Sequence, residues 1–172
     1  MKAVLALLAA ALLLAACAAP LPVPPPVASE GSAVTRARDT TSFTVRSYVT
    51  TGAQRREVAG LACRFEGPGF HADFVTPAEV TAPALGPSQP AATLRCRHDG
   101  EEQTQRLDPY NLTLSTRRAA FETSSAKYGE LRDVIAETLH SLYTASHDGR
   151  HDDFAYPDTD FEFGPRVSAA AQ

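Results

Sequence analysis

The sequence predicts an α+β domain that is mainly β: a small sandwich or barrel-like fold with one C-terminal amphipathic helix packed on one face. Three observations support this. Apolar and polar residues alternate over several short stretches, which is typical of half-buried strands. Turn signals recur between these stretches, such as Gly67-Pro68-Gly69 and Asp99-Gly100. Near the C-terminus the apolar spacing changes to the period of a helix.

The predicted strands lie in a β-rich domain at residues 40–118. Each strand has one inward apolar face and one outward polar face, and the pattern favours a sandwich or barrel. We expect residues 54–65 to form a single strand whose early part is charged. The inward faces are Phe43, Val45 and Val49; Ala59, Leu61, Cys63 and Phe65; Phe70, Ala72 and Phe74; and Ala92, Leu94 and Cys96.

The predicted helix occupies residues 119–149, with Ser124 or Ser125 as its cap and Gly149 as its stop. We expect its apolar stripe to pack on an open face of the sheet, although a partner-binding or membrane-surface helix is an alternative. Residues 150–172 form an aromatic and acidic segment in which a short edge strand returns to the domain, and its last residues are expected to be disordered. The stripe consists of Tyr128, Leu131, Ile135, Leu139 and Leu142, and the returning strand contains Phe161 and Phe163.

The N-terminus has the features of an export signal. Lys2 is followed by residues 3–14, which are all Ala, Val or Leu; this run is shorter than the roughly 20 residues that span a bilayer. Its end, Leu14-Ala15-Ala16-Cys17, resembles the lipobox of bacterial lipoproteins. The resemblance implies that residues 1–16 are a signal peptide and that Cys17 becomes the first mature residue, carrying diacylglycerol and fatty acyl chains. An ordinary secreted protein cut after Ala19 is the alternative.

A proline-rich stretch follows the lipobox. We expect residues 17–39 to be a disordered tether in which the prolines favour extended polyproline II. Ala18 follows Cys17 where an Asp would resemble an inner-membrane retention signal, which favours the outer membrane, at its periplasmic face or the cell surface. The prolines are Pro20, Pro22, Pro24, Pro25 and Pro26.

Cys63 and Cys96 remain once Cys17 is assigned to the lipid. In an oxidising envelope compartment such a pair predicts a disulfide, and both cysteines fall on inward faces, as a bridge between sheets requires. The bridge closes a loop worth about 3.5–4 kcal/mol in the chain-entropy model. A two-cysteine redox site or a zinc site is the alternative, but the spacing is not that of a CxxC motif and two cysteines make a poor zinc site.

The region around these cysteines resembles a module of small proteobacterial lipoproteins, similar to PEGA-like β-domains of envelope proteins. The likeness covers Cys63, the Gly-rich turn, Thr76-Pro77, Val80 and Leu94-Arg95-Cys96. It implies an envelope location and a β fold but little chemistry. In several such proteins a Gly-rich helix and then a Tyr-Pro follow; here Tyr156-Pro157 is present, but the preceding helix is polar.

The densest group of metal-capable residues lies after the predicted helix: His147, Asp148, His151 and Asp152. Imidazoles four residues apart bind a divalent ion together when their segment is helical. Gly149 interrupts the helix between them, so a solvated loop is the favoured interpretation and no metal or other cofactor is expected.

Composition narrows the function. A formal net charge of −4 argues against a nucleic-acid partner. We expect a non-catalytic lipoprotein of the cell envelope whose β-domain binds a protein or cell-wall partner or helps an assembly. The alternative is a small metal-assisted hydrolase that uses His147, His151 and the nearby carboxylates.

Overall fold

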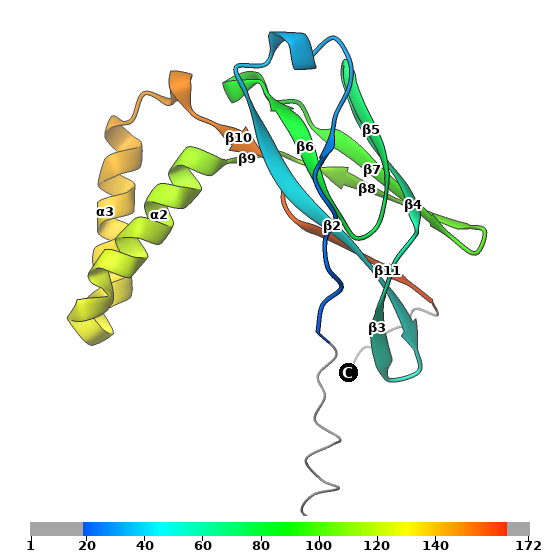
Figure 1. Cartoon of the computed structure of the whole chain (residues 1–172). Coiled ribbons are helices and arrows are strands. Elements are labelled where there is room, and N and C mark those ends of the chain that lie inside the picture. Colours follow the sequence, from blue (N-terminus) through cyan, green and yellow to red (C-terminus); the bar gives the residue numbers. More distant parts are fainter. Residues whose placement is uncertain (1–18, 165–172) are drawn as a thin grey trace, which may run out of the picture.

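Two β-sheets pack face to face, and a pair of helices projects from one end of them (Figure 1). The computed structural model describes residues 19–164, without the side chains of Tyr128 and Glu130. The predicted signal peptide, Cys17 and the last eight residues therefore lie outside the described residues. The fold is α+β, as predicted, and the two sheets form a sandwich because they do not close into a barrel.

The first sheet has five strands in the order β1-β6-β2-β11, with β3 also paired to β2. The pairs β1–β6 and β2–β11 are parallel, and the others are antiparallel. Long β2 is the centre of this sheet because it pairs with three other strands. The strands are β1 (Val27–Ala28), β2 (Asp39–Thr51), β3 (Gln54–Val58), β6 (Ala78–Ala84) and β11 (Thr159–Phe163).

The second sheet is antiparallel, with four strands in the order β5-β4-β7-β8. Its strands are β4 (Ala62–Gly67), β5 (Phe70–Val75), β7 (Ala92–His98) and β8 (Glu101–Leu107). A small third pairing joins β9 (Tyr110–Asn111) to β10 (Phe154–Ala155), where the helices leave the sandwich and return to it.

The core lies between the sheets and follows the predicted alternation. Phe70, Ala72 and Phe74 are buried on β5, and Ala92, Leu94 and Cys96 are buried on β7. Aromatic rings from both sheets meet around Tyr156, whose ring centre lies 5.1 Å from that of Phe65 and 5.9 Å from that of Phe43. The Tyr156 hydroxyl donates a hydrogen bond to the Pro90 carbonyl (2.7 Å), so this buried polar group is satisfied. Burial raises the pKa of Tyr156 to about 12.

Cys63 and Cys96 form the predicted disulfide, and both residues are buried. The expectation that it would join two sheets is wrong. Cys63 on β4 stands directly opposite Cys96 on neighbouring β7, and their Cα atoms are 4.1 Å apart. This is the close spacing of directly opposed residues in an antiparallel pair. The bridge therefore fastens two adjacent strands of one sheet.

The single strand predicted at residues 54–65 is in fact two strands in different sheets. β3 pairs with β2 in the first sheet, whereas β4 belongs to the second. Between them Gly60 adopts φ +83°, a left-handed conformation that favours glycine. The chain crosses from one layer to the other at this point, and Ala59 is exposed rather than inward.

The tether predicted at residues 17–39 is ordered where the structure describes it, from residue 19 onward. Val27 and Ala28 form β1, and Glu30 makes a two-hydrogen-bond bridge to His71 of β5. Ala33 has no exposed surface. The segment therefore closes one edge of the sandwich, since it contacts β6 of one sheet and β5 of the other.

The helical region also differs from the prediction. Two helices, α2 (Leu112–Ser125) and α3 (Arg132–Ser146), replace the single helix at residues 119–149. Ser124 and Ser125 end α2 rather than cap a helix, because their hydroxyls donate to the carbonyls of Phe121 and Glu122. The chain reverses through a 3-10 turn (Ala126–Leu131) in which Gly129 has φ +57°. The predicted returning strand is confirmed: Phe161 and Phe163 are buried on β11.

Candidate functional site: the helical hairpin and its junction with the sandwich

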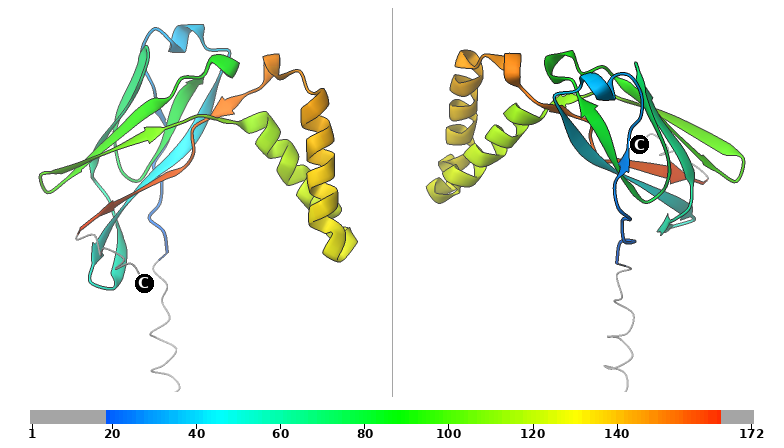
Figure 2. Two further views of the ribbon diagram at one scale, coloured as in Figure 1. Left: turned by 180° about the vertical axis from the view of Figure 1, so that it is seen from behind. Right: turned by 45° about the horizontal axis from the view of Figure 1, so that its top comes forward.

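The helical hairpin, which we define as residues 112–146, stands off the sandwich in every view (Figures 1 and 2). The expectation that its apolar stripe packs on a sheet is wrong. Large apolar side chains are exposed instead: Val134 and Leu142 of α3 are each 64% exposed, and Leu131, the last residue of the 3-10 turn before α3, is 62% exposed. We call these three residues, together with the half-buried Ile135 and the 40% exposed Leu139, the apolar stripe. Tyr128, also predicted in this stripe, has a side chain outside the described residues.

The two helices hold each other along a different side of α3. Ala136 of α3 and Ser125 of α2 are the buried residues of the hairpin. Arg118 forms ion pairs with Glu122 and, at 3.5 Å, with Glu137 across the hairpin. The Tyr143 ring lies 6.2 Å from that of Phe121 and 5.1 Å from the Arg117 guanidinium. Because α2 covers this side, no element within residues 19–164 covers the apolar stripe.

The junction of the hairpin with the sandwich is built on Asn111, His147 and Asp152. The Asn111 side chain caps α2 by accepting a hydrogen bond from the Leu114 amide (2.9 Å). Its amide nitrogen donates to one oxygen of the buried Asp152 carboxylate, while His147, just after α3, binds the other oxygen. The start of α2 and the end of α3 are thereby fastened to the same carboxylate.

Asp152 is held in its charged form. Burial disfavours the carboxylate, but the hydrogen bonds from Asn111 and His147, with the His147 charge, outweigh this effect and place the pKa of Asp152 below its ordinary value. Two more hydrogen bonds complete the junction: the Leu112 amide donates to the Asp153 carbonyl (2.8 Å), and the Asp153 amide donates to the Thr113 side-chain hydroxyl (3.0 Å).

Of the four predicted metal candidates, the structure brings together only His147 and Asp152. Asp148 instead caps the short 3-10 turn Gly149–His151 through the Arg150 amide, and His151 is exposed. Within residues 19–164, no three His, Cys, Asp or Glu residues are grouped so as to hold a metal ion. Both Asp152 oxygens are already engaged by protein donors, so this cluster acts as a fastening of the hairpin.

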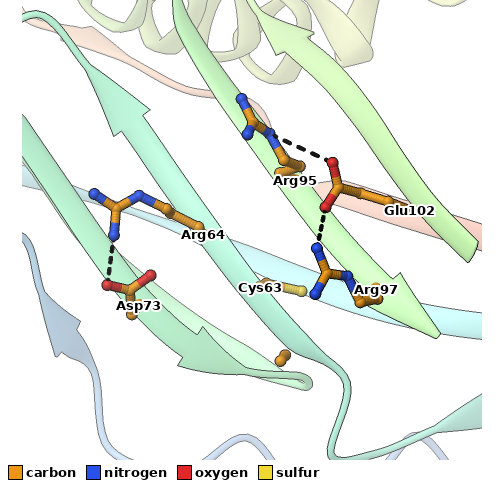
Figure 3. Close-up of a pocket in the computed structure, with 7 residues that line it drawn as sticks. Cys63, Arg64, Asp73, Arg95, Arg97 and Glu102 are labelled. Carbon is orange, nitrogen blue, oxygen red and sulfur yellow. Dashed lines mark hydrogen bonds and ion pairs between the residues drawn. The ribbon is translucent and has the colours of Figure 1, made fainter. Parts of the chain in front are cut away.

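The outer face of the second sheet carries a charged hollow of about 260 Å³ between β4, β5, β7 and β8 (Figure 3). Arg64 bonds Asp73 across β4 and β5 (2.8 Å), and Glu102 lies 2.7 Å from Arg97 and 4.0 Å from Arg95. The hollow is smaller than typical ligand pockets, which begin near 300 Å³. Its charged side chains form ion pairs with one another, so it resembles a solvent-exposed row of ion pairs more than a binding site.

Two side chains, Arg46 and Glu57, bind the N-terminal segment where it reaches the sandwich, and we call this pair the clamp. The Leu21 amide donates to Glu57 (2.9 Å), and the Leu21 carbonyl accepts from Arg46 (3.2 Å). Arg46 and Glu57 also form an ion pair that is only 22% and 10% exposed. The sequence offered no signal for this clamp, because the pairing of β2 with β3 is what brings the two side chains together.

Comparisons with known proteins identify no relative: no family model, no curated protein and no solved structure matches the chain. Among the described residues, no helix combines the length and apolar character needed to cross a bilayer.

Proposed function

We propose that the protein is a lipid-anchored protein of the cell envelope, attached to the outer membrane through Cys17, and that its helical hairpin binds a protein partner. The carrying observation is the apolar stripe of α3. The sandwich buries most of its large apolar side chains, whereas four of the six most exposed large apolar residues that the structure describes lie within residues 131–142, on α3 and the residue just before it. Contiguous exposed apolar surface of this kind marks interaction sites.

The anchor is supported by the lipobox-like residues Leu14-Ala15-Ala16-Cys17 at the end of an apolar run. Two or three acyl chains hold a protein firmly in a bilayer, whereas one gives only marginal binding. On this proposal the PEGA-like resemblance of residues 63–96 describes a β-domain that serves as a rigid support.

The clamp on Leu21 supports a specific placement of the domain. Leu21 is the fourth residue after Cys17, and four residues of extended chain reach at most about 14 Å. A lipidated Cys17 therefore holds the sandwich close to the bilayer with the β2–β3 end nearest the lipid. The tip of the helical hairpin points to the same side of the molecule as the N-terminal segment (Figures 1 and 2).

The anchor is tested by expressing the full chain and its Cys17→Ser variant in a bacterium that processes lipoproteins. We expect the unaltered chain to enter the membrane fraction and to incorporate labelled palmitate, and the variant to do neither. Equal membrane association of both chains would contradict the proposal.

The binding role is tested by placing a photo-reactive benzoylphenylalanine at position 142 in the same cells. We expect a discrete cross-linked species on illumination. The matched control carries the same group at Thr144, which is exposed on the same helix but outside the apolar stripe. A result in which position 142 gives no more cross-linking than position 144 would rule out the stripe as a binding surface.

A further inference from the structure

We propose that the partner of the apolar stripe is a second copy of this chain, so that two α3 helices pair in parallel as the centre of a four-helix bundle. This inference rests on the proposed function and identifies the partner. Among the described residues, α2 packs against one side of α3 and no element packs against the apolar stripe. Pairing with a second copy through α3 covers the stripe of both copies at once.

The spacing along the stripe is that of a coiled-coil seam. Leu131, Ile135 and Leu142 of the stripe, with the neighbouring Thr138 between the last two, alternate three and four residues apart, which are the core positions of a heptad pattern. In a parallel pair the flanking Val134 of one helix lies against the flanking Leu139 of the other, so both exposed flanking residues gain a partner. The seam is therefore complementary to itself.

Charge also favours self-association of the hairpin. Residues 112–146 hold four basic and four acidic residues and are neutral, although the whole chain has a formal net charge of −4. Neutral surfaces associate without the repulsion that separates like-charged copies. The charged residues of the hairpin are Arg117, Arg118, Glu122, Lys127, Glu130, Arg132, Asp133 and Glu137.

The apolar stripe is small, so membrane anchoring is expected to contribute to the pairing. α3 has 15 residues, about 22 Å of helix, so its seam is at the small end of stable interfaces. Two copies anchored in one bilayer meet at a raised effective concentration, which compensates for a small interface. Anchored copies also share one orientation. Since the hairpin tip points to the same side as the N-terminal segment, the two α3 helices run in the same direction (Figure 2).

The test is oxidative cross-linking of the full-length chain in intact membranes after Thr138→Cys. In the parallel pair the two Thr138 positions face each other across the seam, within the reach of a disulfide. Thr144→Cys is the control, because Thr138 and Thr144 are both exposed threonines on α3 whose hydroxyls donate to the carbonyl four residues earlier. We expect a dimer band on a non-reducing gel from Thr138→Cys and none from Thr144→Cys.

A second substitution separates a seam from a chance collision. Leu142→Glu places a carboxylate in the stripe at a position that is 64% exposed, so the folded chain tolerates it. Combined with Thr138→Cys it should abolish the dimer band while circular dichroism stays unchanged. Leu131→Cys reports the direction: it should cross-link to itself in the parallel pair, whereas antiparallel helices would place about 16 Å of helix between the two thiols. Absence of this product would overturn the parallel arrangement.

The inference and the proposed function fail in different ways. If Thr138→Cys gives no more dimer than Thr144→Cys, the second copy is excluded as the partner. A cross-link from position 142 to a different envelope protein would still support the proposed function. Membrane attachment that is independent of Cys17 would instead contradict the proposed anchor.

Discussion

The sandwich and the helical hairpin differ in how far they bury their large apolar side chains. Phe65 and Leu94 are fully buried between the sheets, while Val134 and Leu142 of α3 are 64% exposed. In the sandwich, a strand with one apolar face finds a second sheet opposite it. In the part of the hairpin that the structure describes, only the side of α3 that faces α2 is packed against another element. The comparison separates residues that stabilise the fold from residues that are available for binding.

The largest effect should come from the aromatic centre of the sandwich. Phe65 is fully buried and its ring lies 4.9 Å from Phe43 and 5.1 Å from Tyr156. We expect Phe65→Ala to lower the free energy of unfolding by about 3–5 kcal/mol, because it leaves a cavity in the core. Urea denaturation followed by circular dichroism measures this. A loss below about 1 kcal/mol would mean that the sandwich is not the stabilising part of the molecule.

Removal of the disulfide is expected to have the next largest effect. Reduction of the Cys63–Cys96 bridge should cost about 2–4 kcal/mol, because the open chain regains conformational entropy in its unfolded state. Comparing urea midpoints with and without reductant gives the value. Because the bridge fastens β4 to β7 only, hydrogen exchange in α3 should change no more than the global stability requires. Selective loosening of the hairpin would contradict this separation of the two regions.

The local stability of the junction should depend on the Asp152 carboxylate. Asp152→Ala leaves the side chains of Asn111 and His147 without their shared partner, and we expect a local loss of about 1–3 kcal/mol. Faster amide exchange at Leu114, whose amide is capped by Asn111, is the measurement. The exchange of β4 and β7 serves as the internal control. Equal acceleration in both regions would show that the junction is not a local fastening.

The same junction should depend on pH in the acid range. The folded pKa of Asp152 lies below its unfolded value, so its contribution is complete at neutral pH and is lost as the pH falls through the folded pKa. We expect exchange at Leu114 to rise below about pH 4, after correction for the intrinsic pH dependence of amide exchange. Asp152→Asn should remove this dependence. If the variant retained the acid response, a different group would be responsible.

The smallest effect is expected at the apolar stripe. Leu142→Ala should change the free energy of unfolding of the isolated chain by less than about 0.5 kcal/mol, since its side chain is 64% exposed. The same substitution should weaken cross-linking through Thr138→Cys. A large loss of stability in the isolated chain would mean that Leu142 has a packing role and would blur the distinction between the two regions.

Prediction from sequence succeeded where a short pattern of residues is enough to show which side chains are buried. Phe70, Ala72 and Phe74 alternate with polar neighbours, and one face of such a strand is buried wherever the opposing sheet lies. The same reasoning identified Phe161 and Phe163 as a returning strand, and it placed both disulfide cysteines inside. Whether that disulfide lies within one sheet or links two sheets depends on the order of the strands, and the alternation of apolar and polar residues does not reveal this order.

The errors have specific physical causes. Gly60 carries the chain from one sheet to the other, and a lone glycine in a strand-like stretch does not reveal that crossing. Ser124 and Ser125 look like helix caps but bond to carbonyls of the preceding turn, so they end a helix. The proline-rich segment is predicted to be a disordered tether in extended polyproline II because its prolines disfavour helix and sheet. In the structure, however, β6, Glu57 and Arg46 supply hydrogen-bond partners for the extended chain.

The order of residues alone predicts a mainly β domain, a disulfide and an apolar helical stripe. The strands and the stripe depend on neighbours in sequence, and the disulfide was predicted from the position of its cysteines and the envelope location that the lipobox-like residues imply. The three-dimensional arrangement was needed to learn that the stripe is exposed and that Asp152 fastens the hairpin. Amphipathic spacing reports which side of a helix avoids water, but not what covers that side. What covers a helix depends on which elements the folded chain brings alongside it, and among the described elements only α2 packs along a side of α3.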